Sequence, residues 1–491
     1  MSPRSFLTSA AAALITLAAL NVTATDAPPA DPWSEDLAPD VIRADFADLY
    51  DGLKSAHADL YAQRNKAEYD ARFEATLATF TQPMSRFDVQ MAFQRFAAYG
   101  NVGHARIDFP NEVYQSYREN GGKVLALYPR VVDGVIYVGD NYTGDDRIRA
   151  GDELVAIDGE PMSRWLQRAA EHISADTPYL AQSLMEFTFP RDLWVLAGER
   201  DAFEVSLRRG AKPFTLKVRT TTSEQQQSAS SGTPDAFALD SSARTYRMID
   251  DTIAYLMPGP FYNIDNPSRP WDNAAFLAFI DEAFHHFLEN DATELIIDLR
   301  QNPGGDNSFS DPMLAWFADE PFRFYSEFLI RSSDQAAAAN AARLDAQGDP
   351  ESVSAKFAQR YDEVPRGEVF AFDLPFAQPR DGKRFEGRVT ALVNRHSFSN
   401  AVNVAAIIQD YEFGLIAGEK TSDMATTYGS MEQFTLTRTG INVGFPKAHI
   451  IRPSGARTPD GVTPDWAITS PTGPRSEDVV LNELIERLRA D

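Results

Sequence analysis

Two short runs of apolar and β-branched residues, 293–299 and 389–393, constrain the fold of this chain more than any other feature. Such runs are typical of strands buried inside a parallel sheet, because helices cover both faces of these strands. Helical patterns lie between the two runs. The sequence therefore predicts an α/β domain over residues 237–475. The polar, Ser/Gln-rich residues 220–236 precede it and are predicted to be a flexible linker.

Residues 36–117 are predicted to form a helical N-terminal region. Their apolar side chains follow the i, i+3, i+4, i+7 spacing of an amphipathic helix, as at Phe46, Leu49, Tyr50 and Leu53. We interpret this region as a small helical layer that packs on a larger domain.

Residues 118–219 change to short β patterns, and the pair Asp133-Gly134 between two such runs predicts a hairpin. Segment 148–159 follows with a turn, a buried strand and a second tight turn that lead into a helix. This segment resembles the core of a PDZ domain, in which an extended peptide adds a strand to a sheet edge. An ordinary β-hairpin domain without a ligand is the alternative.

Composition excludes several classes of protein. With 43% apolar residues, 491 residues are enough for two to four domains that each have a core. A formal net charge of −25 argues against binding to nucleic acid or to an anionic membrane surface. The chain has no cysteine, which excludes a thiol nucleophile, a disulfide and a cysteine zinc site.

The first 24 residues have the pattern of an export signal. Arg4 supplies a positive charge, residues 10–20 are apolar, and Val22-Thr23-Ala24 is a small-residue cleavage site, with cleavage after Ala27 as the second choice. The alternative is a membrane anchor, but the apolar run is shorter than the roughly 20 residues that span a bilayer. We therefore expect a periplasmic or secreted protein without a membrane span in the mature chain.

The first motif that could carry chemistry covers residues 298–305, where a buried strand leads into a turn with Gly304 and Gly305. Paired glycines let backbone N–H groups approach a ligand closely. Such a turn can hold a phosphate or an oxyanion. No Gly-Lys-Ser/Thr sequence of a P-loop follows, so nucleotide binding has little support.

The second motif covers residues 391–410, where Ser399 lies between an apolar strand and a helical pattern. Free N–H groups and the positive end of the helix dipole stabilise a negative charge that develops at such a position. The alternative is that Ser399 only caps the helix.

Together with two further motifs, these segments resemble the tail-specific (C-terminal processing) protease family. The motifs are Asp-Leu-Arg-x-Asn-x-Gly-Gly at 298–305, Ser-x-Ser at 397–399, Gly-Glu-Lys-Thr at 418–421 and Gly-Val-Thr-Pro-Asp at 461–465. The resemblance implies a crotonase-like catalytic domain and a serine peptidase that acts on proteins or peptides, with their C-termini as one means of recognition. It implies no metal or organic cofactor. By the family pattern, Ser399 is the nucleophile, and the backbone of Gly304 or Gly305 and of Asn400 forms the oxyanion hole.

The general base is where the sequence departs from the bacterial processing branch, which has a Lys where this chain has Met424. The tricorn-like branch uses a His just before the PDZ segment, and His104 matches it; a neutral imidazole can accept the serine proton. His396 is the rival base. The Glu that orients the His in that branch is Thr458 here, and Asp460, on the same face of an extended segment, is the candidate to replace it.

Two other classes of function stay open. In the first alternative, the protein is catalytically inactive and binds peptides or apolar ligands. In the second, it is a scaffold that acts through the PDZ-like segment alone. The missing Lys and Glu of the two family branches keep the first of these alternatives open.

Overall fold

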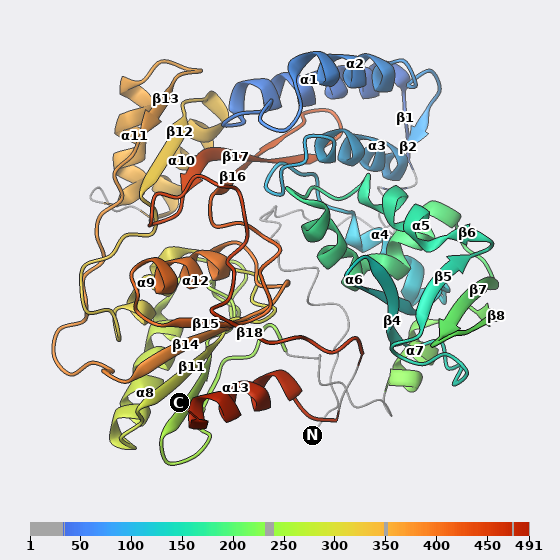
Figure 1. Cartoon of the computed structure of the whole chain (residues 1–491). Helices are drawn as coiled ribbons and strands as arrows, with labels where there is room; N and C mark the ends of the chain where they lie inside the picture. The colour runs from blue at the N-terminus through green and yellow to red at the C-terminus, as the bar shows by residue number, and fades with distance from the viewer. Residues whose placement is uncertain (1–32, 34, 231–239, 348–351, 474–475, 491) are drawn as a thin grey trace, which may run out of the picture.

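The structure is a computed structural model that describes residues 33, 35–230, 240–347, 352–473 and 476–490. Figure 1 shows the N-terminal helices and a four-stranded sheet at the top, a helix-covered sheet at the lower left and a smaller β-rich part on the right. The mixed α/β class predicted from the sequence is confirmed. The predicted export signal, residues 1–24, lies outside the described residues. Within the described part of the chain, none of the helices combines the length and apolar character that a membrane crossing requires.

The sheet at the lower left has the order β18-β15-β14-β11-β10-β9 and is parallel except for β9. Its two central strands are the two apolar runs, because β11 spans Glu294–Asp298, β14 spans Arg388–Val393, and the two pair in parallel. Almost all of their side chains are buried, as expected for interior parallel strands. The other strands are β9 (Thr245–Met248), β10 (Ile253–Met257), β15 (Leu415–Gly418) and β18 (Trp466–Ala467).

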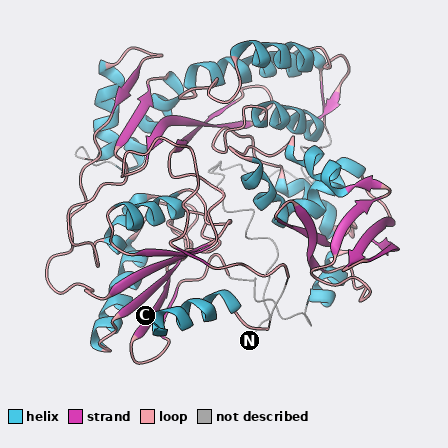
Figure 2. Ribbon diagram, viewed as in Figure 1, coloured by secondary structure: helices cyan, strands magenta, loops and turns pink. Residues whose placement is uncertain are grey.

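Helices cover both faces of this sheet, as Figure 2 shows. On one face α8 (Ala274–Glu289), α9 (Asn307–Leu314) and α12 (Asn400–Asp410) form a common hydrophobic core with the strands. On the other face, apolar side chains of α13 (Val479–Ala490) pack on the sheet. The first nine residues of α12 are all buried, so this helix is held firmly from its first turn.

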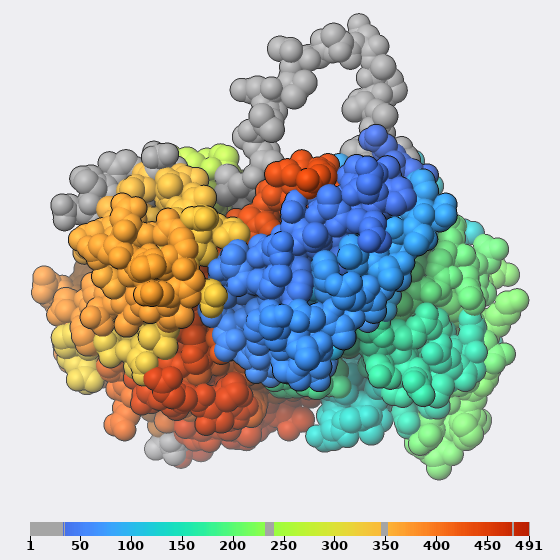
Figure 3. Space-filling view, turned by 90° about the horizontal axis from the view of Figure 1, so that it is seen from above, coloured from blue at the N-terminus to red at the C-terminus, as the bar shows by residue number. Residues whose placement is uncertain are grey.

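A second sheet, antiparallel and ordered β13-β12-β17-β16, joins the N-terminal helices to the rest of the molecule. Phe46, Leu49 and Leu53 of the first helix are fully buried in the core above this sheet, which explains their helical spacing. In Figure 3 the N-terminal helices lie between α10–α11 and the β-rich part. The elements are β1 (Asp36–Leu37), α1 (Pro39–Ala56), α2 (Lys66–Leu77), β2 (Met84–Ser85), α3 (Arg86–Ala98), α4 (Asn111–Glu119), β12 (Glu327–Arg331), α10 (Asp334–Gln347), α11 (Val353–Glu363), β13 (Val369–Ala371), β16 (Thr427–Thr435) and β17 (Asn442–Ile451).

The β-rich part has a sheet of its own, ordered β3-β4-β5-β7-β8. The hairpin predicted at Asp133-Gly134 joins β3 to β4, and these residues have φ values of 50° and 77°, as tight two-residue hairpin turns require. Helix α6 packs against β3, at the edge of the sheet. The elements are β3 (Leu127–Val132), β4 (Val135–Asn141), β5 (Glu153–Ile157), β6 (Glu160–Pro161), α5 (Met162–Ala170), α6 (Pro178–Ala197), β7 (Ala202–Arg209) and β8 (Lys212–Arg219).

Where the sequence predicted a flexible linker at 220–236, the structure has a short helix, α7 (Ser223–Ser230). Gln226 of this helix is buried, accepts a hydrogen bond from Arg118 Nη2 at 3.0 Å and donates to the Tyr128 hydroxyl at 3.0 Å. These side-chain contacts order a segment whose Ser/Gln composition gave no sign of burial. Residues 231–239 lie outside the described residues.

Candidate active site

The two motifs that could carry chemistry meet at the carboxyl end of the parallel sheet. They follow β11 and β14, which are neighbouring parallel strands, so both turns emerge at the same edge. The N–H of Phe398 donates to the carbonyl of Asn302 at 3.0 Å, and the hydroxyl of Ser397 donates to the carbonyl of Leu299 at 2.8 Å. These bonds hold the Gly-rich turn against the residues that precede α12.

The charged residues of the first motif have a structural role. Arg300 Nη2 lies 2.6 Å from Asp298 Oδ2 and 2.6 Å from Asp478 Oδ2. Asp298 also accepts the Tyr255 hydroxyl at 2.8 Å. The buried guanidinium is thus paired with two carboxylates, as a buried charge must be. It joins the end of β11 to the segment that leads into α13.

Ser399 lies at the N-cap of α12 but does not cap it. Its backbone has φ 52° and ψ −119°, and its side chain makes no capping hydrogen bond. A serine that only caps a helix has an extended backbone, and its hydroxyl accepts an N–H of the first turn. Holding a non-glycine residue in such a conformation costs about 1–3 kcal/mol. The turn therefore leaves the hydroxyl uncommitted at the amino end of a helix.

Two backbone N–H groups beside Ser399 are available to stabilise an oxyanion. The N–H of Gly304 is already used, because it donates to Asn302 Oδ1 at 2.9 Å. Among the described residues, no hydrogen bond engages the N–H of Gly305 or that of Asn400, and Gly305 is exposed. Of the positions that the family pattern allowed, Gly305 and Asn400 are thus the available donors.

Gly304 packs directly against the serine, so this position has no room for a side chain. At its φ of 85°, a Cβ atom would lie 2.6 Å from the Asn400 nitrogen and 2.9 Å from Ser399 Cβ. Gly304→Ala should displace the turn and, with it, the proposed oxyanion donor Gly305. It should therefore lower kcat/KM by at least about 10²-fold, as the loss of an oxyanion donor does. Gly455→Ala is the matched control, since Gly455 has φ 79° and nothing within 4 Å of such an atom. Similar losses of activity in the two variants would contradict this packing argument.

His104 comes from the N-terminal region and reaches the residue before the serine. Its buried ring stacks on Phe398, with centroids 5.7 Å apart and planes inclined by 21°. Burial and the nearby Arg106 lower the pKa of His104 from 6.5 to about 4, and a hydrogen bond with the Tyr428 backbone opposes this shift. Within the described residues, Nδ1 is buried without a partner. The ring is therefore neutral at neutral pH and has a free nitrogen.

His396, the rival base, is fully engaged elsewhere. Its Nδ1 lies 2.8 Å from the Ser183 hydroxyl and its Nε2 lies 3.0 Å from Glu186 Oε2. Both ring nitrogens thus contact the β-rich part. Although His396 is three residues from Ser399 in the sequence, it has no nitrogen left with which to accept the serine proton.

Asp460 lies at the surface. Its carboxylate forms an ion pair with Lys420 at 2.6 Å, and the side chains of Lys420 and Asp460 are 41% and 56% exposed. No contact between Asp460 and His104 is seen in the described part of the chain, so the orienting role of Asp460 stays a prediction. Met424, at the position of the Lys in the processing branch, is buried and pairs with Gly461 in an isolated β-bridge.

Sequence reasoning missed two carboxyl groups at this site. Asp423 is fully buried, and its Oδ2 accepts the backbone N–H of Ser399 at 2.6 Å. Asp176, in the segment before α6, accepts the N–H of Gly103, the neighbour of His104, at 2.9 Å. Burial raises the pKa of Asp423 to about 6, and burial together with the charge of Asp423 raises that of Asp176 to about 7. The one signal in the sequence was that Asp423 follows the Gly-Glu-Lys-Thr motif closely.

The raised pKa of Asp176 should make stability depend on pH. The free carboxyl ionises near 3.8, whereas the folded protein keeps it protonated up to about pH 7. Its contribution to stability is therefore full below pH 3.8 and is lost as the pH rises through about 7. Asp176→Asn keeps an oxygen that can accept the Gly103 N–H, so the melting temperature of the variant relative to the parent should increase as the pH is raised. Calorimetry at acidic and alkaline pH tests this; a difference that is independent of pH would contradict it.

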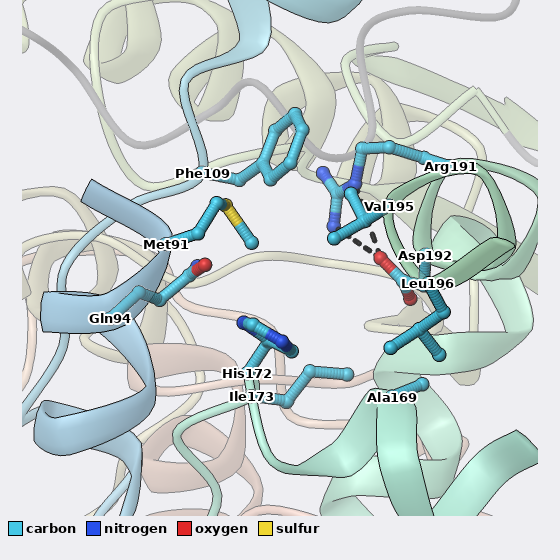
Figure 4. Close-up of a pocket in the computed structure, with 10 residues that line it drawn as sticks. All are labelled: Met91, Gln94, Phe109, Ala169, His172, Ile173, Arg191, Asp192, Val195 and Leu196. Carbon is cyan, nitrogen blue, oxygen red and sulfur yellow. Dashed lines mark hydrogen bonds and ion pairs between the residues drawn. The ribbon is translucent and has the colours of Figure 1, made fainter. Parts of the chain in front are cut away.

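The hollow drawn in Figure 4 lies away from Ser399. It lies between α3, α5 and α6, with the ion pair of Arg191 and Asp192 on one wall. No residue that lines it belongs to the turns after β11 or β14, so this hollow is not the site of the serine. Its lining residues are Met91, Gln94, Phe109, Ala169, His172, Ile173, Arg191, Asp192, Val195 and Leu196.

The segment that contains Ser399 matches a known peptidase family. Residues 274–468 match the sequence model of peptidase family S41. The chain carries a peptidase family S41 domain. The protein is accordingly a serine-type peptidase. Ser399 and the Gly-rich turn lie inside the S41 match, whereas His104 lies before it.

Solved structures share the fold. Mature CPAF complexed with lactacystin aligns with a TM-score of 0.63 and 15% identity over 92% of this chain and 98% of that chain. Mature CPAF alone aligns with a TM-score of 0.62 and 16% identity over 92% and 96%. The photosystem II D1 C-terminal processing protease aligns over 87% of this chain and 92% of its own, with 17% identity and a TM-score of 0.41. No curated protein matches the chain significantly in sequence.

Proposed function

We propose that this S41 peptidase hydrolyses peptide bonds with Ser399 as nucleophile and His104 as general base. The observation that carries the proposal is the conformation of Ser399, which occupies an N-cap position without using its hydroxyl as a cap. The N–H groups of Gly305 and Asn400 lie beside it, and the buried, neutral ring of His104 stacks on the adjacent Phe398.

In the proposed reaction, Ser399 Oγ attacks the peptide carbonyl while His104 accepts its proton. The negative charge that develops on the carbonyl oxygen is stabilised by the N–H groups of Gly305 and Asn400 and by the positive end of the α12 dipole. The imidazolium then gives its proton to the leaving amine. Water repeats the sequence on the acyl-enzyme and releases the serine.

A fluorophosphonate probe separates this proposal from that of an inactive peptide- or apolar-ligand-binding relative. Such probes react readily only with an activated serine. The protein should be labelled stoichiometrically, and mass spectrometry should place the label on Ser399. Labelling that is absent, or that persists in Ser399→Ala, would refute catalysis by this serine.

The β-rich part supports a proposal about how substrates bind. Side chains cover the backbone of its edge strand, β3. The N–H of Val131 donates to Glu186 Oε1 at 3.2 Å, and the carbonyl of Val131 accepts a hydrogen bond from Arg395 Nη1 at 2.6 Å. A peptide that adds as a strand to β3 would have to displace these side chains. Its C-terminal carboxylate could then take the place of the Glu186 carboxylate between two arginines. Arg130 and Arg395 lie 3.1 and 2.8 Å from the Glu186 carboxylate.

Amidating the C-terminus of a peptide substrate should therefore raise KM about tenfold or more, the effect of losing a charge-assisted hydrogen bond. The rate constant kcat should change little, because the scissile bond is unaffected. Matched peptides with free and amidated ends, assayed by steady-state kinetics, provide the measurement. Equal KM values for the two peptides would argue against recognition of the carboxyl end.

The proposed substrates are exported proteins or peptides, because residues 1–24 have the pattern of an export signal. Export through such a signal would direct the enzyme to the periplasm or outside the cell. Sequencing the N-terminus of the protein purified from its natural location should give a chain that begins at Thr25. A chain that retains the apolar residues 10–20 would contradict cleavage of this signal.

A further inference from the structure

Asp423 is fixed in place independently of the serine. The hydroxyl of Thr421 donates to the carbonyl of Asp423 at 2.8 Å and accepts the N–H of Val462 at 2.9 Å. The carboxylate is fully buried and accepts the backbone N–H of Met424 as well as that of Ser399. Contacts between the loop after β15 and residues near 462 therefore set its position.

We propose that Asp423 is a positioning residue of this site and holds the Ser399 backbone in the conformation that frees the hydroxyl for attack. This inference rests on the proposed function. Asp423 Oδ2 lies 2.6 Å from the nitrogen of Ser399, the residue with φ 52° and no capping hydrogen bond. A hydrogen bond to a charged acceptor is roughly twice as strong as one between neutral groups.

The competing conformation of Ser399 is that of an ordinary N-cap. Its backbone would be extended, and its hydroxyl would accept the N–H of Ala401 or Val402. Turning the backbone in this way would take the Ser399 N–H away from Asp423, whose Oδ1 already lacks a partner among the described residues. Losing a further partner of a buried carboxylate is unfavourable. Asp423 thus selects against the conformation in which the hydroxyl is occupied.

A second carboxyl group extends this arrangement toward the proposed base. Asp176 accepts the N–H of Gly103 at 2.9 Å, and its charge interacts with that of Asp423. Because Gly103 precedes His104, carboxyl oxygens engage the backbone at both the proposed base and the proposed nucleophile. Three separate segments of the chain, near residues 103, 176 and 423, converge at this point.

Two substitutions of Asp423 test the inference. Asp423→Ala removes the acceptor, whereas Asp423→Asn keeps an oxygen and can direct its amide toward Asp176. In the Ala variant, kcat and the rate of fluorophosphonate labelling should fall about 10²-fold with KM nearly unchanged, while the Asn variant should stay within about threefold of the parent. Asp192→Ala removes a partly buried carboxyl of α6 that also has a raised pKa, and it should leave kcat unchanged.

Crystal structures of the variants supply a readout that does not depend on activity. Ser399 should keep its positive φ in Asp423→Asn and should become an ordinary N-cap in Asp423→Ala. A positive φ retained in the Ala variant, or an Asn variant as slow as the Ala variant, would overturn the inference. Asp423→Ser, whose side chain is too short to reach the Ser399 N–H, replaces the Ala variant if that one does not fold. A parent protein that neither cleaves peptides nor reacts with the probe would refute the proposed function, and the φ of Ser399 in the variants would still decide the role of Asp423.

Discussion

Ser399→Ala should abolish hydrolysis of unstructured protein substrates, with kcat/KM reduced by roughly 10⁶-fold, as when other serine peptidases lose their nucleophile. The hydroxyl oxygen is the proposed attacking atom, and the methyl group of alanine cannot supply its function. The variant should fold like the parent, because the hydroxyl makes no capping hydrogen bond and alanine fits the same turn. Steady-state kinetics and thermal unfolding of the purified variant give the two measurements.

Ser397→Ala is the matched control, since Ser397 is the other serine of the Ser-x-Ser turn. Its hydroxyl donates to the Leu299 carbonyl at 2.8 Å and accepts the N–H of Asn394 at 3.1 Å. This substitution should lower the free energy of unfolding by about 1–3 kcal/mol, because it leaves buried polar groups unpaired. Near-parent turnover in Ser399→Ala, or complete inactivity of a well-folded Ser397→Ala, would refute the assignment of the nucleophile.

The convergence of the two motifs could be predicted from the sequence, and the reason is topological. Runs 293–299 and 389–393 are apolar on both faces, which predicts interior parallel strands, and the carboxyl ends of such strands share one edge. The strands β11 and β14 do pair in parallel. What local sequence could not supply was the conformation of Ser399, because its positive φ depends on contacts with residues that are distant in the sequence.

The sequence also could not show which of Gly304 and Gly305 supplies the free N–H of the proposed oxyanion hole. Both glycines have a positive φ, so propensity alone treats them alike. The side chain of Asn302 distinguishes them, because its Oδ1 accepts the N–H of Gly304. A hydrogen bond between residues two apart is set by the local turn geometry, which the sequence pattern did not specify.

Sequence proximity was misleading for the histidines. His396 is close to Ser399 in the chain, but its ring contacts Ser183 and Glu186 of the β-rich part. His104 is almost three hundred residues away, yet its ring stacks on Phe398. Only the resemblance to the tricorn-like branch indicated His104, because no spacing rule connects residues on separate domains.

The β-rich part is joined to the serine turn by a buried ion cluster. Arg395, four residues before Ser399, lies 2.8 Å from Glu186, which in turn lies 3.1 Å from Arg130. Glu419 Oε1 also accepts a hydrogen bond from Arg395 Nε at 2.9 Å. Removing one partner of such a buried ion pair typically destabilises a protein by about 3–5 kcal/mol. Deleting the β-rich part would therefore disturb the nucleophile turn, so its role in substrate binding is better tested by changing the substrate.

His104→Gln should lower kcat/KM by about two to four powers of ten while the fold is retained, because glutamine preserves polarity and approximate size but cannot accept the proton. In the parent enzyme only the neutral ring can act as base, and burial lowers the pKa of His104 to about 4. Activity that depends on this ring should therefore be lost as the pH falls through about 4, well below the usual 6.5. The variant should lack this ionisation in its pH profile.

His396→Gln is the control for the base, since His396 carries the same kind of ring and lies three residues before Ser399. It should mainly lower stability, because it disturbs the buried contacts with Ser183 and Glu186. The opposite pattern, an inactive His396→Gln beside an active His104→Gln, would exclude His104 as the base. So would a Lys420→Met variant that is silent with its fold intact, because Lys420 is paired with Asp460 at the surface and has no part in the proposed proton transfer. An ionisation near 6.5 that disappears in His104→Gln would instead mean that the ring of the working enzyme is solvated, which requires the contact with Phe398 to open before the serine is activated.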